Sequence, residues 1–167
     1  EKILAYLAEG HFRRQHEEGY AEALAFAEDG TPAADTAAEH ISLKFSYYKT
    51  GTFDYDTASG AYLVGQYDGP YIDGADGIQV SAVNVLVLET SIYVNAGDTA
   101  GRMTAKLTGE GKGTFFCGGR SVPIHWSRAD RYSPFVYTME DGTPLVLGQG
   151  KSYICIINPR DSTLTIN

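Results

Sequence analysis

The sequence predicts a mainly β fold, an antiparallel sandwich or barrel-like domain of roughly ten short strands with a short N-terminal helix. Nineteen glycines, twelve tyrosines and seven phenylalanines lie among many short apolar runs, a composition that favours strands and tight turns. The chain has 167 residues, of which 43% are hydrophobic and 20% are charged, as in a compact globular domain. One principal folded domain is therefore expected.

The first residues are expected to form a short helix. Apolar side chains recur along residues 2–9 at the spacing of one helical face, and Gly10 follows as a C-cap. The segment 16–29 is ambiguous, because its alanines suit a helix whereas nearby glycines interrupt one, and both alternatives stay open. The small, polar sequence DGTPAADTAA then indicates a linker. We therefore divide the chain into a helix and connector at 1–40 and a β domain at 41–167.

Beyond residue 40, short apolar runs alternate with turn sequences. Several connections place Asp ahead of Gly, which favours tight turns, and Gly118-Gly119 has the composition of a two-residue hairpin loop. Strands are predicted over the apolar runs at residues 41–48, 52–55, 61–66, 78–80, 83–94, 102–108, 114–117, 121–127, 135–139, 144–147 and 152–157.

Three sequences imitate ligand-binding loops. DGADG at 73–77 resembles the start of a calcium loop, but Asn84 stands where the bidentate glutamate is needed, so a turn is predicted. GEGKG at 109–113 and GQGKS at 148–152 resemble phosphate-binding loops. The second is followed by a strand-like run instead of the helix that would hold a phosphate. Both glycine-rich sequences are interpreted as hairpin connections.

The net charge of −8 is concentrated in the first 40 residues, which hold nine acidic and three basic side chains. Such a chain repels phosphate backbones, and its sequence has no basic run of the kind that nucleic-acid-binding proteins use. The longest apolar run, VNVLVLETSIYV, is interrupted by polar residues and is shorter than the roughly 20 residues of a membrane helix. We expect neither a nucleic-acid partner nor a membrane-spanning segment.

The sequence indicates no metal site, no cofactor and no catalytic motif. His40 and His125 are two of four histidines, none of which pairs with another at the spacing of a helical metal site. Cys117 and Cys155 lie in strand-like runs and are expected to be buried thiols, although whether they pair stays open. An enzyme would use one of these two histidines with Asp130 or a nearby carboxylate.

The single tryptophan lies in the sequence IHWSRADRYSPFVY. Strand alternation places Trp126 on the face of its aliphatic neighbours, in the core, and His125 on the opposite face. The charged sequence that follows is interpreted as a loop, from which Arg128, Arg131 and Tyr132 are candidate binding residues.

Six tyrosines fall within residues 47–71. Phenol rings present flat, amphipathic surfaces that suit sugar rings or peptides, although tyrosine is also favoured in strands and packs across them. From this cluster the candidate binding residues are Tyr47, Tyr48, Tyr67 and Tyr71.

In order, FDYDTASGAYL, YIDGADG, SAVNVLVLE, LTGEGKGTFF, the HW pair and GQGKSYICIINP resemble the C-terminal domain of the YerB-like lipoproteins, a bacterial domain of unknown function. The resemblance covers residues 41–159, and EKILAYLAEG resembles the family's linking helix. It implies an extended connector at 20–32 and a parent chain with a secretion signal, a lipid-modified cysteine and another domain, all of them upstream of this sequence. It transfers no catalytic residue.

These observations favour a non-enzymatic, extracytoplasmic domain of a bacterial envelope lipoprotein that binds a cell-envelope protein or a cell-wall polymer. Membrane attachment would come only through the lipid of the full-length protein. One alternative is an envelope-acting hydrolase, which needs a histidine, a carboxylate and a nucleophile within hydrogen-bond reach. Another is a structural spacer without a ligand, which predicts a surface with no sizeable cleft or aromatic patch.

Overall fold

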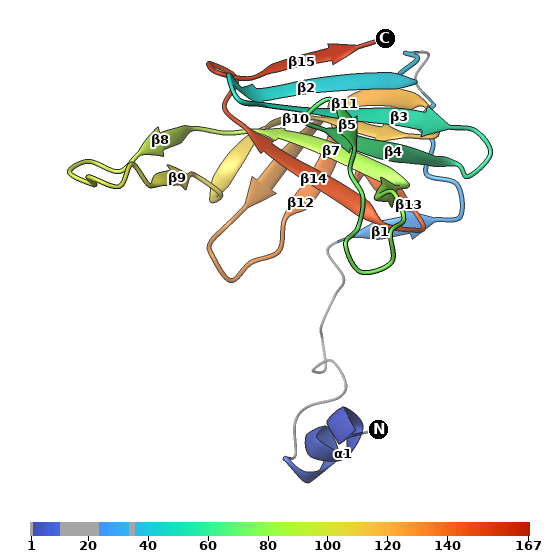
Figure 1. Cartoon of the computed structure of the whole chain (residues 1–167), viewed down its shortest axis with the longest axis horizontal. Coiled ribbons are helices and arrows are strands. Elements are labelled where there is room, and N and C mark those ends of the chain that lie inside the picture. The colour runs from blue at the N-terminus through green and yellow to red at the C-terminus, as the bar shows by residue number, and fades with distance from the viewer. Residues whose placement is uncertain (1, 11–23, 34–35) are drawn as a thin grey trace.

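The computed structural model describes residues 2–10, 24–33 and 36–167, and its strands form a two-layer β sandwich (Figure 1). Its elements are α1 (Lys2–Glu9), β1 (Ala25–Ala27), β2 (His40–Ser46), β3 (Lys49–Asp56), β4 (Ala61–Gln66), β5 (Gly69–Pro70), β6 (Ser81–Ala82), β7 (Asn84–Glu89), β8 (Ile92–Val94), β9 (Met103–Ala105), β10 (Gly109–Cys117), β11 (Arg120–Arg128), β12 (Val136–Met139), β13 (Val146–Gly148), β14 (Ser152–Ile157) and β15 (Thr163–Ile166).

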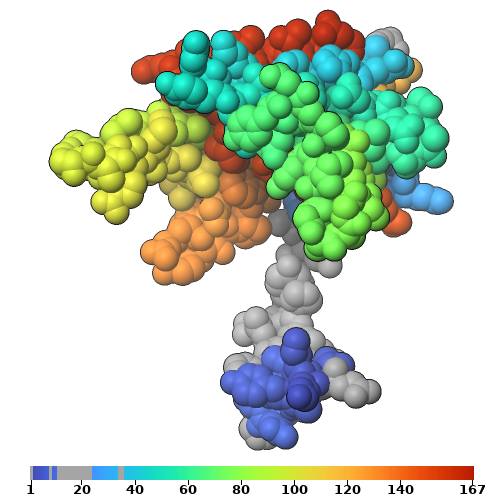
Figure 2. Space-filling model, viewed as in Figure 1, coloured from blue at the N-terminus to red at the C-terminus, as the bar shows by residue number. Residues whose placement is uncertain are grey.

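Two sheets make up the layers. The five-stranded sheet has the order β12-β11-β10-β7-β14, and the six-stranded sheet has the order β15-β2-β3-β4-β5, with β6 also paired to β4. Most neighbours are antiparallel, but β14 runs parallel to β7, and β1 runs parallel to β13 in a separate ribbon. The β8–β9 hairpin projects from the body of the sandwich (Figures 1 and 2). The predicted mainly β sandwich is confirmed, and the described strands do not close into a barrel.

The main core lies between the two sheets. Alternate residues of β2, β3 and β4 pack against one face of β7, β10 and β14, as the period of two in a strand requires. The fully or nearly buried members are Ala38, Ile41, Leu43, Phe53, Tyr62, Val64, Val85, Val87, Phe116, Cys155 and Ile157.

A second core covers the other face of the five-stranded sheet. Strand β7 therefore contributes to both cores, and all of its residues except the last are buried. The members of this second core are Leu86, Leu88, Phe115, Cys117, Val122, Ile124, Trp126, Tyr137, Leu145 and Leu147. Trp126 belongs to it and His125 is exposed on the opposite face, so the predicted alternation along β11 is confirmed.

The sequence GEGKG forms the first part of β10 and is not the predicted hairpin connection. It lies in the sheet because its glycines make room for the second core. A Cβ on Gly111 would lie 2.5 Å from Nε1 of Trp126, and a Cβ on Gly113 would lie 2.7 Å from the carbonyl oxygen of Val87. The indole Nε1–H itself donates to the carbonyl of Glu89 at 3.1 Å.

Asn84 is a fully buried polar residue at the start of β7. Its Oδ1 accepts a hydrogen bond from the Gly148 amide at 2.8 Å, and its Nδ2 donates to the Gly148 carbonyl at 2.8 Å. The side chain thus satisfies both backbone groups of Gly148, a residue of β13. GQGKS is consequently not a hairpin connection, because β13 pairs with β1 whereas β14 pairs with β7.

Several predicted strands differ from the observed ones. The predictions for 61–66 and 152–157 coincide with β4 and β14. The run at 83–94 divides into β7 and β8, because after Thr90 the chain leaves the sheet and forms the projecting hairpin. Residues 78–80 are not a strand and contribute only an isolated bridge from Gln79 to Ile72. Strands β1, β5, β6 and β15 were not predicted.

The predicted turns at Gly118-Gly119 and at DGADG are confirmed. Gly118 and Gly119 have φ of 60° and 72°, as a tight two-residue hairpin loop requires. In DGADG, Oδ1 of Asp73 accepts the amide of Ala75 at 2.8 Å, and Oδ1 of Asp76 accepts the amide of Ile78 at 2.8 Å. These carboxylates therefore cap their own turn.

The predicted helix over residues 2–9 is confirmed as α1. Of the ambiguous segment, 16–23 lies outside the described residues, and the described remainder contains the extended strand β1. Strand β1 pairs with β13, so this part of the expected connector contacts the β domain. No described helix has the length and apolar character needed to cross a bilayer.

The two cysteines are both free and buried. Cys155 lies in the core between the sheets and Cys117 lies in the second core, on the opposite face of the same sheet. Their side chains therefore point apart and cannot form a disulfide.

Candidate binding site

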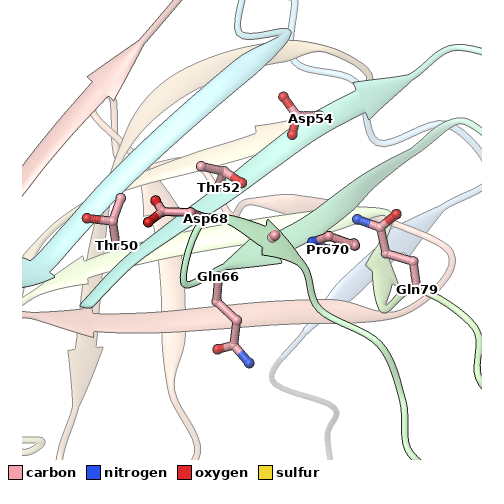
Figure 3. Close-up of a pocket in the computed structure, with 9 residues that line it drawn as sticks. Thr50, Thr52, Asp54, Gln66, Asp68, Pro70 and Gln79 are labelled. Atoms are coloured by element: carbon pink, nitrogen blue, oxygen red, sulfur yellow. The ribbon is translucent and has the colours of Figure 1, made fainter. Parts of the chain in front are cut away.

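A polar cleft of about 500 Å³ lies on the outer face of the six-stranded sheet (Figure 3). We call it the outer cleft. Its walls come from β3, from the end of β4 with the turn and strand that follow, and from the segment before β6. The lining residues are Thr50, Thr52, Asp54, Gly65, Gln66, Asp68, Gly69, Pro70 and Gln79.

Strand β3 places three of these residues because it alternates between core and solvent. Gly51 and Phe53 are buried, whereas the residues between and after them face the cleft. Figure 3 shows Thr50, Thr52 and Asp54 along one side of β3. Two hydroxyl groups and one carboxylate thus form a polar row on a rigid strand.

Gly65 keeps the floor of the outer cleft open. It lies opposite Thr52 in the register of β3 and β4. A Cβ on Gly65 would lie 2.4 Å from Oγ1 of Thr52, so any side chain there would collide with that hydroxyl group. The absence of a side chain therefore lets a ligand approach the backbone of the sheet closely.

Gln79 contributes an oriented amide to the cleft. Its Nε2 donates to the carbonyl of Val64 at 2.9 Å, which fixes the side chain and leaves the amide oxygen as an acceptor. Gln66 turns its side chain away from the β3 row, as Figure 3 shows. The cleft therefore offers hydroxyl groups, two carboxylates and one amide, and none of its lining residues is lysine or arginine.

Asp54 also contacts the histidine opposite it. The Nδ1 of His40 is hydrogen-bonded to Oδ1 of Asp54 across β2 and β3, and the two side chains are 44% and 57% exposed. A hydrolase would need a nucleophile on the other ring nitrogen. Among the described residues, no hydroxyl or thiol group is recorded within hydrogen-bond distance of this imidazole.

The structure gives the predicted arginine candidates a structural role in their own loop. Arg128 donates from Nε to the carbonyl of Ser133 at 2.7 Å and from Nη2 to the carbonyl of Arg131 at 2.7 Å. Its guanidinium also lies over the ring of Phe135, 5.0 Å from the centroid. Arg131 lies over the exposed ring of Tyr132 at 5.0 Å. These three candidate residues belong to the loop after β11 and do not line the outer cleft.

Three of the four candidate tyrosines gather at one end of the six-stranded sheet. The register aligns Gly51 with Gln66, so the β2–β3 turn and the β4–β5 turn lie at the same end. Tyr47 and Tyr48 are 86% and 85% exposed in the first turn, and Tyr67 is 66% exposed in the second. This is the end at which Thr50 and Asp68 line the cleft. Tyr71, at 36% exposed, follows β5, and none of the four candidate tyrosines is itself a lining residue of the cleft.

Two other hollows are less complete as sites. One, of about 660 Å³, is lined by Lys112, His125 and Thr138 with their neighbours, and these side chains have no recorded hydrogen bonds to one another. The other, of about 220 Å³, lies between the residues after β1 and the second core. No group of three or more described acidic, histidine or cysteine side chains meets in a way that could hold a metal ion.

Sequence reasoning missed the outer cleft, although a signal for it exists. In TGTFDYD, polar side chains recur at every second position opposite buried ones, which identifies an outward-facing polar row. The sequence does not show which residues lie beside this polar row. Asp68 and Gln79 are brought next to it by the pairing of the strands.

Comparisons with known proteins agree with this architecture. Residues 41–154 match a family described as "Protein of unknown function (DUF3048) C-terminal domain". The structure resembles the crystal structure of the YerB protein from Bacillus subtilis with a TM-score of 0.71 and 18% identity, which establishes a shared fold. The match covers 98% of this chain and 52% of that chain, so the present chain spans about half of YerB. None of the curated proteins compared with the chain matches it.

Proposed function

The chain belongs to the DUF3048 family, of which it carries the C-terminal domain, and on that premise we propose that it is a non-enzymatic binding domain for a hydroxyl-rich cell-wall polymer. We propose further that it acts outside the cytoplasm, in an envelope lipoprotein anchored by lipid in its full-length form. The resemblance to YerB-like lipoproteins supports this location. The observation that carries the binding function is the outer cleft.

The chemistry of the cleft favours a glycan over an apolar or an anionic ligand. Carboxylate and amide oxygens accept hydrogen bonds from sugar hydroxyl groups, and threonine hydroxyl groups both donate and accept. The cleft volume of about 500 Å³ is in the range of small-ligand sites, but its walls are more polar than those of most such sites. With Asp54 and Asp68 in the walls and no lining cation, a polyanion would be repelled.

The exposed tyrosines add the second part of a glycan site. A phenol ring stacks against the apolar face of a sugar while its hydroxyl group stays in water. Tyr47, Tyr48 and Tyr67 lie at the end of the sheet where the cleft ends, on two adjacent turns. A polymer lying along β3 would meet the threonine row first and these rings next.

A sedimentation assay with purified cell-wall sacculi tests the proposal. The variant Thr50→Val/Thr52→Val removes both hydroxyl groups of the row with little change in shape, and we expect about tenfold weaker binding or more. Thr163→Val/Thr165→Val is the matched control, because these exposed threonines of β15 lie on the same sheet outside the cleft. Absence of binding by the wild-type domain, or equal binding by both double variants, would refute the proposal.

The His40–Asp54 hydrogen bond favours a hydrolase as a second candidate. In that case His40→Ala would abolish release of soluble fragments from sacculi while leaving their binding largely intact. A wild-type domain that binds sacculi and releases no fragments would exclude hydrolysis of this substrate. A spacer without a ligand is less favoured, because it gives no reason for an open polar cleft beside exposed aromatic rings.

A further inference from the structure

The turn between β4 and β5 has an unusual backbone. Tyr67 and Asp68 have φ of 53° and 61°, and they are the non-glycine residues with positive φ in the described part of the chain. A left-handed conformation is tolerated by aspartate but is a genuine outlier for a bulky residue such as tyrosine. Two-residue hairpin turns of this type usually carry Asn-Gly or Asp-Gly.

An Asp-Gly pair is available in the sequence, one residue further along. The register nevertheless pairs Gln66 with Gly69 and Gly65 with Pro70, which leaves Tyr67 and Asp68 as the two turn residues. A turn shifted to Asp68-Gly69 would relieve Tyr67 but would change the pairing of β5 and withdraw Asp68 from its present place. The observed turn is therefore the more strained of two that this sequence could form.

The side chains of the turn do not compensate for this strain within the protein. Every other described aspartate accepts a hydrogen bond: Asp29, Asp54, Asp56, Asp73, Asp76, Asp98, Asp130, Asp141 and Asp161. Asp68 has no recorded partner in the described part of the chain, although it lines the outer cleft. The ring of Tyr67 is 66% exposed and has no recorded ring contact there.

We propose that this strained turn is a binding element of the outer cleft, kept at the expense of stability because it presents two side chains to the ligand. Asp68 accepts hydrogen bonds from hydroxyl groups of a sugar ring, and Tyr67 stacks on the apolar face of that ring. Backbone strain of this kind is characteristic of ligand-binding sites. The inference rests on the proposed glycan function and extends it to the turn that follows β4.

The variant Tyr67→Asn/Asp68→Gly separates the two roles of the turn, because it installs the preferred turn residues and removes both side chains. We expect its Tm to rise by about 2–6 °C. We expect its affinity for N-acetylglucosamine tetramer, measured by NMR titration, to fall about tenfold or more. Tyr93→Thr is the matched control: it removes an exposed tyrosine of the projecting strand β8, whose φ is not positive, and it should change neither quantity.

Asp68→Asn completes the design, since asparagine keeps the shape and tolerates the same backbone but is a weaker acceptor for hydroxyl groups. Weaker binding of the tetramer at an unchanged or slightly raised Tm supports the proposal. If the wild-type domain binds the tetramer and the double variant binds equally well, the role of the turn is refuted while the proposed function stands. If the wild-type domain binds neither the tetramer nor sacculi, both fail. A double variant with a lowered Tm would refute the inferred strain.

Discussion

The indole Nε1 of Trp126 lies only 2.5 Å from the position that a Cβ on Gly111 would occupy. The ring is 2% exposed, and its nitrogen donates to the carbonyl of Glu89, so it cannot move aside without losing burial and a hydrogen bond. This contact explains why residue 111 is a glycine, although in the sequence GEGKG it resembles part of a phosphate-binding loop. The second core, and not a ligand, requires it.

Gly111→Ala should lower the free energy of unfolding by about 1–3 kcal/mol, because the added methyl group overpacks the second core. Urea denaturation followed by the fluorescence of Trp126 measures the change. Gly74→Ala is the control, since a Cβ at Gly74 has nothing within 4 Å. Equal stability of the two variants would contradict the proposed contact.

Asn84→Leu should lower the free energy of unfolding by about 2–4 kcal/mol, since it leaves both the N–H and the C=O of Gly148 without a partner in the interior. Ser152→Ala removes only the 3.3 Å contact to the same amide and should cost much less. Chemical denaturation of both variants gives the comparison. If Asn84→Leu lowers the free energy of unfolding no more than Ser152→Ala does, the two hydrogen bonds between Asn84 and the backbone of Gly148 are unimportant for stability.

The free energy of unfolding should fall as the pH rises above about 8.5, which is the ordinary pKa of a cysteine thiol. Burial raises the pKa of the Cys155 thiol to about 12 and also raises the pKa of Tyr62 and of Tyr137. A group with a raised pKa in the folded state contributes its full stabilisation below its unfolded pKa and loses it as the pH rises through the folded one. Between its unfolded and its folded pKa, each such group therefore lowers the free energy of unfolding by up to about 1.4 kcal/mol for every unit that the pH rises.

Urea denaturation at pH 7, 9 and 10.5 measures this decline. Cys155→Ala removes one of the responsible groups and should flatten the curve above pH 8.5, whatever its effect on stability at neutral pH. A wild-type stability that is constant over the range would be inconsistent with buried, protonated thiol and phenol groups.

Both thiols should react with a disulfide reagent only on unfolding. Burial also raises the pKa of Cys117, beside the carboxylate of Asp29, so neither cysteine is exposed as a thiolate at neutral pH. We expect two thiols per chain to react in denaturant and almost none in the native state. The reducing agent should leave the Tm unchanged, whereas a lower Tm after reduction would indicate a disulfide that the geometry forbids.

The sequence carries local information well and pairing information poorly. Strands β4 and β14, the turn at Gly118-Gly119 and the burial of Trp126 follow from period-two patterns and turn chemistry, which act over a few residues. Strand β1 is three residues long and exists because β13 lies beside it, a partner more than a hundred residues away. No local pattern could have predicted it.

The same distinction applies to the candidate site. Tyr67 was a sequence candidate because of its residue type, and the structure places it in the turn that borders the outer cleft. Asp68 was not a sequence candidate, and it lines the outer cleft because the pairing of Gln66 with Gly69 places it in the turn after β4. The arginine candidates stay a prediction, and the structure adds that Arg128 is hydrogen-bonded within its own loop, to the carbonyl of Ser133.

The position of β15 at the end of the six-stranded sheet has a consequence for folding kinetics. Ile166 pairs with Ile41, and β14 pairs with β7, so each of the two sheets is completed by a strand that lies far from its partner in the sequence. Contacts between residues this distant in sequence close slowly. A nascent chain that still lacks these strands would leave one edge of β2 and one edge of β7 without a partner strand, so neither sheet can be completed before β14 and β15 have been synthesised.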